Sequence, residues 1–438
     1  MDFFLFLLVN FTLFLRPSEI IPALAEVPIY NILIVLALVP AAPRLAQCLR
    51  PDRLTRDPVT VCVVGLIPAV ALSQLSHFQL GLAYLAVLDF SKSVVYYLLL
   101  IAVVNSAQRL RFFLYAVALF AAAGAAIAVL HYFEFISVPT LTTLQDSDLD
   151  EETGEISTVL RLRATGIFGD PNDLSMMAVM GLVISLFGLG DSQLKAFRFA
   201  WVMPLALFFL TLILTKSRGG ILAFVAAGGT ISWLRFGLWK TVAALVVALP
   251  LVVLASGSRQ SNVGGALSGG TGHARVELWS GGLVALRQSP LFGIGFNMYA
   301  DEVGQVAHNS FVHGFVELGL FGGALFLGAF WFAGLSLWKL RNTSPSPHRF
   351  LADPSFRRMQ PYCLAILSGA VLSMFSLSRT YVVPTYLVLG VANAYCLESQ
   401  RQGIRAPLSI TPGRIAALAL LSIGFLIVIQ IFIKLTLR

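Results

Sequence analysis

The sequence has very little charge for its length. Only 12% of its 438 residues are Asp, Glu, Lys or Arg, whereas 57% are hydrophobic and the mean hydropathy is +0.83. A typical soluble domain has about twice this charged fraction and cannot bury so much apolar surface. This composition excludes a soluble fold and predicts an integral membrane protein.

Several other features are scarce or missing, and each excludes a class of function. The four cysteines form no Cys-x-x-Cys pair, which argues against a disulfide framework and a zinc site. There is no Gly-rich phosphate loop, so an ATP-driven machine is not expected. The basic residues are spread over many loops, which excludes nucleic acid as a partner despite the net charge of +8. No Asp-x-Asp pair lies beside the polar motifs described below, and we expect no metal and no other cofactor.

Long apolar runs are what the sequence has in abundance. About 20 apolar residues cross about 30 Å of hydrocarbon as a helix, and in lipid a helix satisfies its own backbone polar groups. We therefore expect an all-α, polytopic integral membrane protein, a single membrane domain over residues 1–438 with about 12–13 transmembrane helices. The candidate spans lie near 3–15, 21–40, 59–76, 83–104, 112–130, 172–190, 200–215, 219–234, 241–256, 310–338, 361–378, 382–397 and 414–435.

Lys and Arg gather in alternate gaps between these spans. Short cytoplasmic loops carry the excess of positive charge, so we expect these gaps to face the cytoplasm. The other gaps then face outward, among them the segment 257–309, which we predict to be one long extracytoplasmic loop. The first run has no basic segment before it and no Ala-x-Ala-like cleavage site, so we expect it to be a membrane segment rather than a removable signal peptide.

Although the chain is mostly apolar, polar residues cluster at several places in the gaps that are expected to face outward. Lys216 and Arg218 lie in a very short turn between two spans, where they serve either as anchors at the membrane surface or as a cationic site. Arg275 and Trp279 lie in the long loop, where a solvated helix is the alternative to a binding role. Arg379 is a further external cation between two spans.

His308 and Asn309 stand at the start of the span near 310–338. A neutral imidazole here can accept a proton near pH 7, although a lone His in such a place is more often structural. His313 and Glu317 follow at a spacing of four residues, which puts them near one another on one helix face. The glycines after Glu317, beginning with Gly319, have the spacing of close helix packing.

These residues resemble the motifs of the bacterial O-antigen ligase and O-antigen polymerase superfamily of membrane glycan transferases. The stretch 218–222 is similar to the family's Arg-x-x-x-Leu motif. His308-Asn309, nine residues and then Gly319-x-x-Gly322 are similar to its His-(Asn/Ser/Gln)-x9-Gly-x-x-Gly motif. The resemblance is close over roughly residues 166–323. Family ligases usually have twelve spans with both ends inside, whereas thirteen spans would put this C-terminus outside.

The resemblance implies a glycosyltransferase that takes a glycan from an undecaprenyl diphosphate carrier and attaches it to an acceptor hydroxyl, with inversion and without a cofactor. His308 would be the general base, and Arg218 and Arg275 would bind the leaving diphosphate. Substrate-binding roles are expected for Arg379, Lys216, Glu317, Asn309 and Trp279.

The resemblance also implies a place and partners. The protein would lie in the bacterial cytoplasmic (inner) membrane with its active site toward the periplasm, and would serve polysaccharide or lipopolysaccharide biosynthesis of the cell envelope. Its partners would be the lipid bilayer, the undecaprenyl-diphosphate-linked glycan donor, and a hydroxyl acceptor on a lipid core, a glycan or a protein.

Several functions share these motifs. Within the superfamily, a ligase, a polysaccharide polymerase and an O-oligosaccharyltransferase remain alternatives. From another class, a glycolipid flippase or transporter would also hold a diphosphate with cations, but it is expected to place charge near the bilayer midplane, where Asp89 and Lys92 are the chief candidates. A transferase would gather Arg218, Arg275 and His308 at one outward cavity, whereas a transporter would centre its cavity on Asp89.

Overall fold

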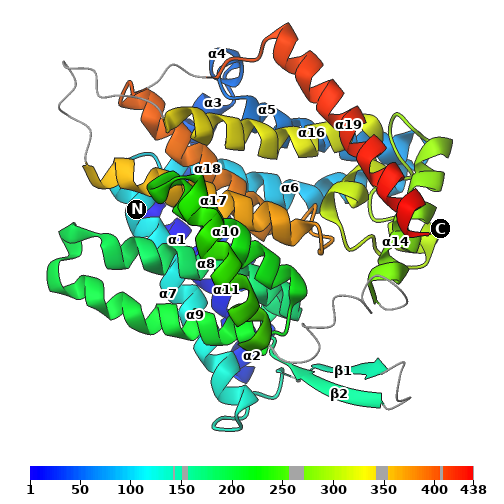
Figure 1. Ribbon diagram of the computed structural model, residues 1–438. Coiled ribbons are helices and arrows are strands. Elements are labelled where there is room, and N and C mark those ends of the chain that lie inside the picture. The colour runs from blue at the N-terminus through cyan, green and yellow to red at the C-terminus, as the bar shows by residue number, and fades with distance from the viewer. Residues whose placement is uncertain (142–143, 150–155, 256–270, 342–353, 405–407, 438) are drawn as a thin grey trace. The chain divides into compact units, whose positions relative to one another are not determined.

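The computed structural model is almost entirely helical (Figure 1). It describes residues 1–141, 144–149, 156–255, 271–341, 354–404 and 408–437. Among these residues, ten helical stretches of 18 residues or more are apolar enough to cross a membrane. The prediction of an all-α polytopic membrane protein is confirmed.

Helices lie at all thirteen places where spans are expected. Ten of these places hold the stretches that are both long enough and apolar enough to cross a membrane. The other three are occupied by α11 (Leu238–Ala255), α17 (Pro354–Met374) and α18 (Val383–Arg401). The ends of α17 and α18 are polar, with Arg357 and Arg358 in the first and Glu398 and Arg401 in the second. The second expected span begins at Ile29 rather than near residue 21, because the proline-containing stretch before it forms only short turns.

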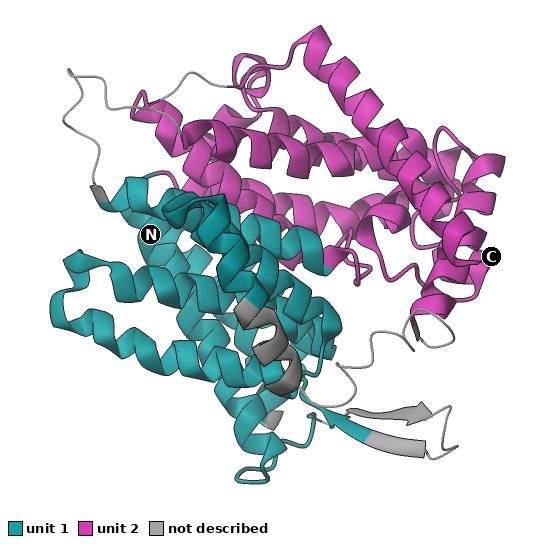
Figure 2. Cartoon of the chain, in the orientation of Figure 1, with its two compact units in different colours: residues 1–40, 106–261, 353–373 teal, residues 41–105, 262–352, 374–438 magenta. Residues whose placement is uncertain are grey.

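The chain forms two compact units (Figure 2). Unit 1 consists of residues 1–40, 106–261 and 353–373, and unit 2 of residues 41–105, 262–352 and 374–438. Each unit is therefore assembled from three separated stretches of sequence. The expectation of a single membrane domain over the whole chain stays a prediction.

Unit 1 is built around α8. Of the ten membrane-length stretches among the described residues, α8 has the largest share of buried residues, 83% of its most apolar 18-residue window. Close packing on α8 depends on small residues, since a Cβ at Gly181 would lie 2.4 Å from the ring of Phe208 on α9. The elements of this unit are α1 (Asp2–Leu15), α2 (Pro17–Ile20), η1 (Pro22–Leu24), the first part of α3 (Ile29–Cys48), α7 (Ala107–Tyr132), β1 (Leu144–Leu149), β2 (Ile156–Arg161), η2 (Gly166–Phe168), α8 (Pro171–Gly190), η3 (Ser192–Trp201), α9 (Val202–Leu214), α10 (Arg218–Phe236), α11 and most of α17.

A β-hairpin is the one departure from the all-α expectation among the described residues. Strands β1 and β2 pair antiparallel, with Leu144 opposite Arg161 and Leu149 opposite Ile156. The hairpin arises in the segment between two expected spans, where the sequence shows no apolar run. Its second strand ends at Arg161, which becomes important for the site below.

Unit 2 is centred on α16, which packs along α5 and also contacts α14, α18 and α19 (Figure 1). Its elements are α4 (Pro51–Leu54), α5 (Pro58–Leu75), α6 (Leu80–Val103), α14 (Thr271–Gln288), α15 (Tyr299–Val303), α16 (Ser310–Leu340), α18 and α19 (Pro412–Thr436). The described part of the predicted external loop 257–309 thus contains two helices, and residues 257–270 lie outside the described residues.

A buried polar cluster joins α5, α6 and α18 within unit 2. Asp57 caps α5 by accepting from the backbone N–H of Thr60 at 3.1 Å. Asn393 Nδ2 lies 3.0 Å from each Asp57 carboxylate oxygen and 2.8 Å from the hydroxyl of Tyr97. Because buried polar groups are costly unless they are hydrogen-bonded, the four side chains stabilise one another and fix the mutual packing of the three helices.

Replacement of Asp57 by Ala tests this cluster. Asp57→Ala removes the helix cap and the buried carboxylate that accepts from Asn393 and Thr60, so the free energy of unfolding should fall by about 2–4 kcal/mol. The matched control is Asp52→Ala, which changes an exposed Asp in the first turn of α4. Thermal unfolding in detergent is the measurement, and equal midpoints for the two variants would contradict the role of the cluster.

Candidate active site

The turn between α9 and α10 in unit 1 carries two of the predicted cations. Ser217 caps α10, since its Oγ accepts from the backbone N–H of Gly220 at 3.1 Å. Lys216 has a left-handed backbone with φ of 48°, and Arg218 is the first residue of α10. Both side chains are half-buried. Lys216 and Arg218 therefore lie on either side of the residue that caps α10, in a short connection between two helices.

A buried arginine from the hairpin holds this turn in place. Arg161 is only 8% exposed, and its Nε donates to the carbonyl of Thr215 at 3.0 Å. Its Nη2 donates to Asn172 Oδ1 at 3.0 Å, which also accepts from Ser217 Oγ at 2.7 Å. Arg161 was not among the site residues expected from the sequence. The only signal for it in the sequence was an Arg in the polar segment between the expected spans 112–130 and 172–190.

In unit 2, helix α16 is broken at Gly319, where φ is 67° and ψ is −169°. The segment 290–295 pairs with the two sides of this break. The N–H groups of residues 294 and 295 donate to the carbonyls of residues 316 and 317, and those of residues 320 and 321 donate to the carbonyls of residues 290 and 291, all at 2.9–3.2 Å. Backbone groups that the break would leave unsatisfied in a membrane span are bonded in this way.

Glycine is required at the break for two reasons. A Cβ at Gly319 would lie 2.4 Å from the backbone of Leu291, and a Cβ at Gly293 would lie 2.4 Å from the backbone of Glu317. Both glycines also have positive φ, 67° and 77°. The expectation that Gly319 serves close packing between helices is wrong, because Gly319 is where the chain leaves the helix. The nine residues between Asn309 and Gly319 form one short half-helix.

Asn309 begins this half-helix. Its Oδ1 accepts from the N–H groups of Phe311 and Val312 at 3.1 and 3.2 Å, which makes it the N-cap. Asn309 is fully buried, and its Nδ2 has no hydrogen-bond partner among the residues that the structure describes. His308 directly precedes it, half-buried and with φ of 49°.

Helix α14 is fastened to the residue before His308. The indole Nε1 of Trp279 donates to the carbonyl of Ala307 at 2.7 Å. Arg275 lies four residues before Trp279 on α14, so both side chains leave the same face of the helix. Arg275 and His308 therefore lie on neighbouring segments of unit 2.

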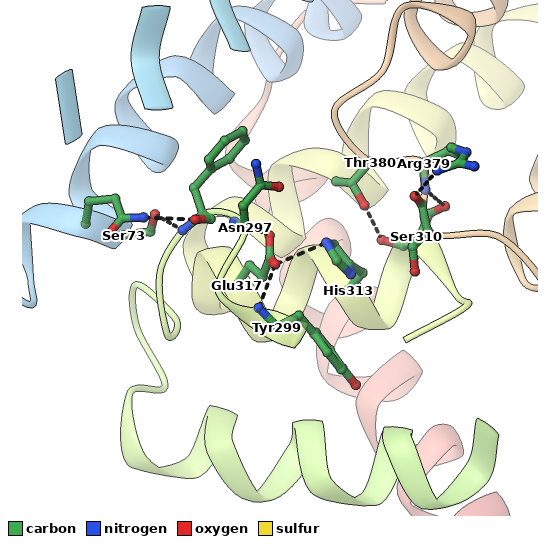
Figure 3. Close-up of polar contacts among 11 residues, drawn as sticks. Ser73, Asn297, Tyr299, Ser310, His313, Glu317, Arg379 and Thr380 are labelled. Atoms are coloured by element: carbon green, nitrogen blue, oxygen red, sulfur yellow. Dashed lines mark hydrogen bonds and ion pairs between the residues drawn. The ribbon is translucent and has the colours of Figure 1, made fainter. Parts of the chain in front are cut away.

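Arg379 is fastened to the other side of the half-helix. Its backbone N–H donates to Ser310 Oγ at 2.9 Å, and Thr380 Oγ1 donates to the carbonyl of Ser310 at 2.9 Å (Figure 3). Ser310 directly follows Asn309. The structure thus brings the Arg379 loop to the start of the half-helix, beside the His308-Asn309 pair.

Glu317 is fully buried beneath this region (Figure 3). Its Oε2 accepts from the N–H of Asn297 at 2.9 Å, and its Oε1 accepts from the N–H of Tyr299 at 3.0 Å. His313 Nε2 lies 3.2 Å from Oε1, which confirms the predicted proximity of these two side chains. Protein groups occupy both carboxylate oxygens, so Glu317 is placed to hold the chain rather than to contact a substrate.

The tyrosines around Glu317 are poor proton acceptors. Burial raises the pKa of Tyr381, and the nearby Glu317 carboxylate raises it further. The same two causes, in the same order, raise the pKa of Tyr299. Both phenols therefore stay protonated at neutral pH. This leaves an imidazole as the better candidate base.

A comparison with protein-family models matches residues 203–327 to the family described as O-antigen ligase. The matched stretch contains the turn with Arg218, helix α14, the His308-Asn309 pair and the break at Gly319. Residues 203–327 are thus similar to an O-antigen ligase domain. This confirms the resemblance to the O-antigen ligase and polymerase superfamily, whose members transfer glycans. A search of curated proteins finds no match.

The predicted site residues fall into both units. Arg275, Trp279, His308, Asn309 and Glu317 belong to unit 2, as does Arg379 beyond the matched stretch, whereas Lys216 and Arg218 belong to unit 1. The expectation that Arg218 and Arg275 serve one cavity stays a prediction. No group of three or more His, Cys, Asp or Glu able to hold a metal occurs in the described parts of the chain.

The charged pair on which a transporter would depend lies at the surface of unit 2. Lys92 Nζ is 2.8 Å from Asp89 Oδ1, and the side chains are 67% and 60% exposed. Each of these charges has its partner within the same helix. Such a pair does not form the centre of an enclosed site in unit 2, which favours the O-antigen ligase domain as the functional region.

Substitution of Gly319 tests the break in the O-antigen ligase domain. Gly319→Ala would force a side chain into a left-handed conformation and against the backbone of Leu291, so it should destabilise the protein by about 1–3 kcal/mol. Gly424→Ala in α19 is the control, since a Cβ there meets nothing within 4 Å. The measurement is the unfolding midpoint in detergent. A Gly319→Ala protein as stable as the Gly424→Ala protein would argue against the break.

Proposed function

We propose that the protein is an O-antigen ligase-type glycosyltransferase of the bacterial cytoplasmic membrane. It transfers a glycan from an undecaprenyl diphosphate carrier to an acceptor hydroxyl at the periplasmic face, with inversion and without a metal. The observation that best supports this is the half-helix that begins at His308-Asn309. The segments bearing Arg275 and Arg379 are both hydrogen-bonded next to its start.

The chemistry requires one base and several cations. The bond between C1 of the sugar and the diphosphate oxygen breaks, and its electron pair leaves with the diphosphate. The acceptor oxygen forms the new bond to C1 from the opposite face, and its proton passes to the imidazole of His308. Arginines are suited to the diphosphate because a planar guanidinium donates two parallel hydrogen bonds to phosphate oxygens. Arg275 and Arg379 fit this role in unit 2.

Asn309 is suited to bind an oxygen of the donor. Its Oδ1 is occupied as the helix cap, whereas its Nδ2 is a buried donor for which the described residues supply no acceptor. An unsatisfied buried donor is costly, and a substrate oxygen would remove that cost. The half-helix also directs the positive end of its dipole toward this point, which favours an anionic ligand.

Arg218 completes the proposed set of catalytic residues. We assign it to the same diphosphate on the strength of its motif, 218–222, within the matched ligase stretch. The buried Arg161 and the Ser217 cap hold its turn rigid, as a binding cation requires. Lys216 in the same turn is assigned to the carrier or the glycan. For Trp279 and Glu317, the hydrogen bonds to Ala307 and to Asn297 and Tyr299 favour positioning roles over substrate contact.

Purified protein incubated with carrier-linked glycan and separate acceptors tests the function. Transfer to a lipid core, to a carrier-linked glycan or to Ser and Thr of a protein would assign it as a ligase, a polymerase or an O-oligosaccharyltransferase respectively. EDTA is present throughout, since no metal is required. Absence of transfer to every acceptor, together with movement of the glycolipid across vesicle bilayers, would establish a flippase instead.

Replacement of His308 tests the general base. His308→Ala should lower kcat by about 10²–10⁴, the usual contribution of a positioned base, with little change in donor binding. His313 should not restore the rate, because its Nε2 faces Glu317. In the wild type, activity should fall once the pH is low enough to protonate the imidazole of His308, since the protonated ring cannot accept a proton.

The control for this experiment is His131→Gln, which changes a half-buried His in the last turn of α7. Donor binding is measured separately from turnover. A His308→Ala protein that loses donor binding and keeps its turnover rate would make His308 a phosphate ligand, and another residue would then be the base.

Charge reversal tests the two arginines. Arg218→Glu and Arg275→Glu should each lower transfer by about 10²-fold or more, because a carboxylate repels the developing charge that the guanidinium stabilises. Membrane insertion should remain intact. Arg287→Glu, at the other end of α14, is the control on the same helix. Undiminished activity of Arg275→Glu would remove Arg275 from the mechanism.

A further inference from the structure

We propose that Glu317 is a positioning residue that fixes the segment 297–308, and with it His308, against the broken helix α16. This inference rests on the proposed function and assigns Glu317 a part in it. Glu317 acts through other groups and does not contact the substrate. From the sequence alone, Glu317 was expected to bind substrate.

Glu317 holds this segment through its carboxylate. It donates no hydrogen bond and accepts two from the main chain, from Asn297 at 2.9 Å and from Tyr299 at 3.0 Å. One carboxylate thus fixes two backbone positions at the start of α15. His313 lies 3.2 Å from the same carboxylate, and its ring is stacked on that of Tyr299 at 5.2 Å with an angle of 8° between the planes.

The segment 297–308 is held at both ends. Glu317 holds it at residues 297 and 299, and the indole of Trp279 holds it at Ala307, next to His308. Between these points the hydroxyl of Tyr299 donates to the carbonyl of Leu278, the neighbour of Trp279. The segment is therefore tied to α16 at one end and to the helix that carries Arg275 at the other.

The contacts of residue 317 match a carboxylate better than a carboxamide. A carboxylate has two oxygens that only accept, which matches two backbone N–H donors pointing at one place. A carboxamide has one such oxygen, so one of the two N–H groups would face an NH2 group. A fully buried carboxylate in a membrane span is also costly, and such residues generally serve the site they are placed beside.

Positioning predicts a loss of turnover without a loss of affinity. A general base displaced by about 1 Å loses on the order of 10²-fold in rate, whereas groups that bind the donor from other segments keep their contacts. Glu317→Gln should therefore lower kcat by about 10–100-fold with the KM for the donor changed by less than about threefold. Glu317→Asp keeps both accepting oxygens and should recover part of the rate.

The decisive comparison is a double-mutant cycle with Trp279→Phe, which removes the indole N–H and keeps an aromatic ring. If Glu317 and Trp279 fix the same segment, their effects on kcat should be non-additive. The control cycle pairs Glu317→Gln with Glu302→Gln, an exposed residue of α15, and should be additive. Rates are normalised to donor-binding sites, so that misfolded protein does not count.

Hydrogen exchange supplies a readout that does not depend on activity. Glu317→Gln should speed amide exchange in residues 296–308 and leave α5 and α6 unchanged. The positioning role would be overturned if the wild type is active and Glu317→Gln has the same kcat and the same amide exchange as the wild type. Additive effects with Trp279→Phe would overturn it as well.

Two further outcomes separate this inference from the proposed function. If Glu317→Gln abolishes turnover as completely as His308→Ala and removes the fall of activity at low pH, Glu317 is itself the base and the positioning role is wrong. If the wild type transfers no glycan to any acceptor, the proposed function fails, whatever the exchange experiment shows about the segment.

Discussion

The hydrogen bonds that satisfy the break in α16 are the constraint on which the candidate site depends. A helix that stops within a membrane span leaves N–H and C=O groups without partners, and lipid supplies none. In this protein the segment 290–295 supplies them, with bonds on both sides of Gly319. The segment after α14 must therefore lie along α16. That placement delivers residues 297–308 to the start of the half-helix.

Each unit fixes its polar turn by burying one ionisable side chain. In unit 1 the guanidinium of Arg161 reaches the turn that carries Arg218, and its hydrogens go to a carbonyl and to an amide oxygen. In unit 2 the carboxylate of Glu317 reaches the segment that carries His308, and its oxygens accept from two N–H groups. A buried charge that is already hydrogen-bonded within the protein is expensive to move, so each holds its neighbouring segment rigidly.

Hydropathy was enough to predict the helices, because about 20 apolar residues have few alternatives in lipid. The spacing of His313 and Glu317 predicted their contact for a similar reason, since both belong to one regular half-helix. The break was not predictable in this way. Gly319 lies in an apolar run that continues to Leu340, and the interruption depends on pairing with residues 22–30 positions earlier. Arg161 was missed because its partner turn lies more than 50 positions along the chain.

The fixed spacing of the His motif follows from the same geometry. Asn309 must cap the half-helix, and Gly319 must meet the segment 290–295, so the residues between them are a helix with both ends specified. One residue added to that helix would turn its start by about 100° and move it by about 1.5 Å. Asn309 and Ser310 would then leave the Arg379 loop, while Glu317 and Gly319 kept their partners. A motif written as nine unspecified residues is therefore a length requirement, and the side chains within it are constrained only where they pack or bond, as His313 and Glu317 do.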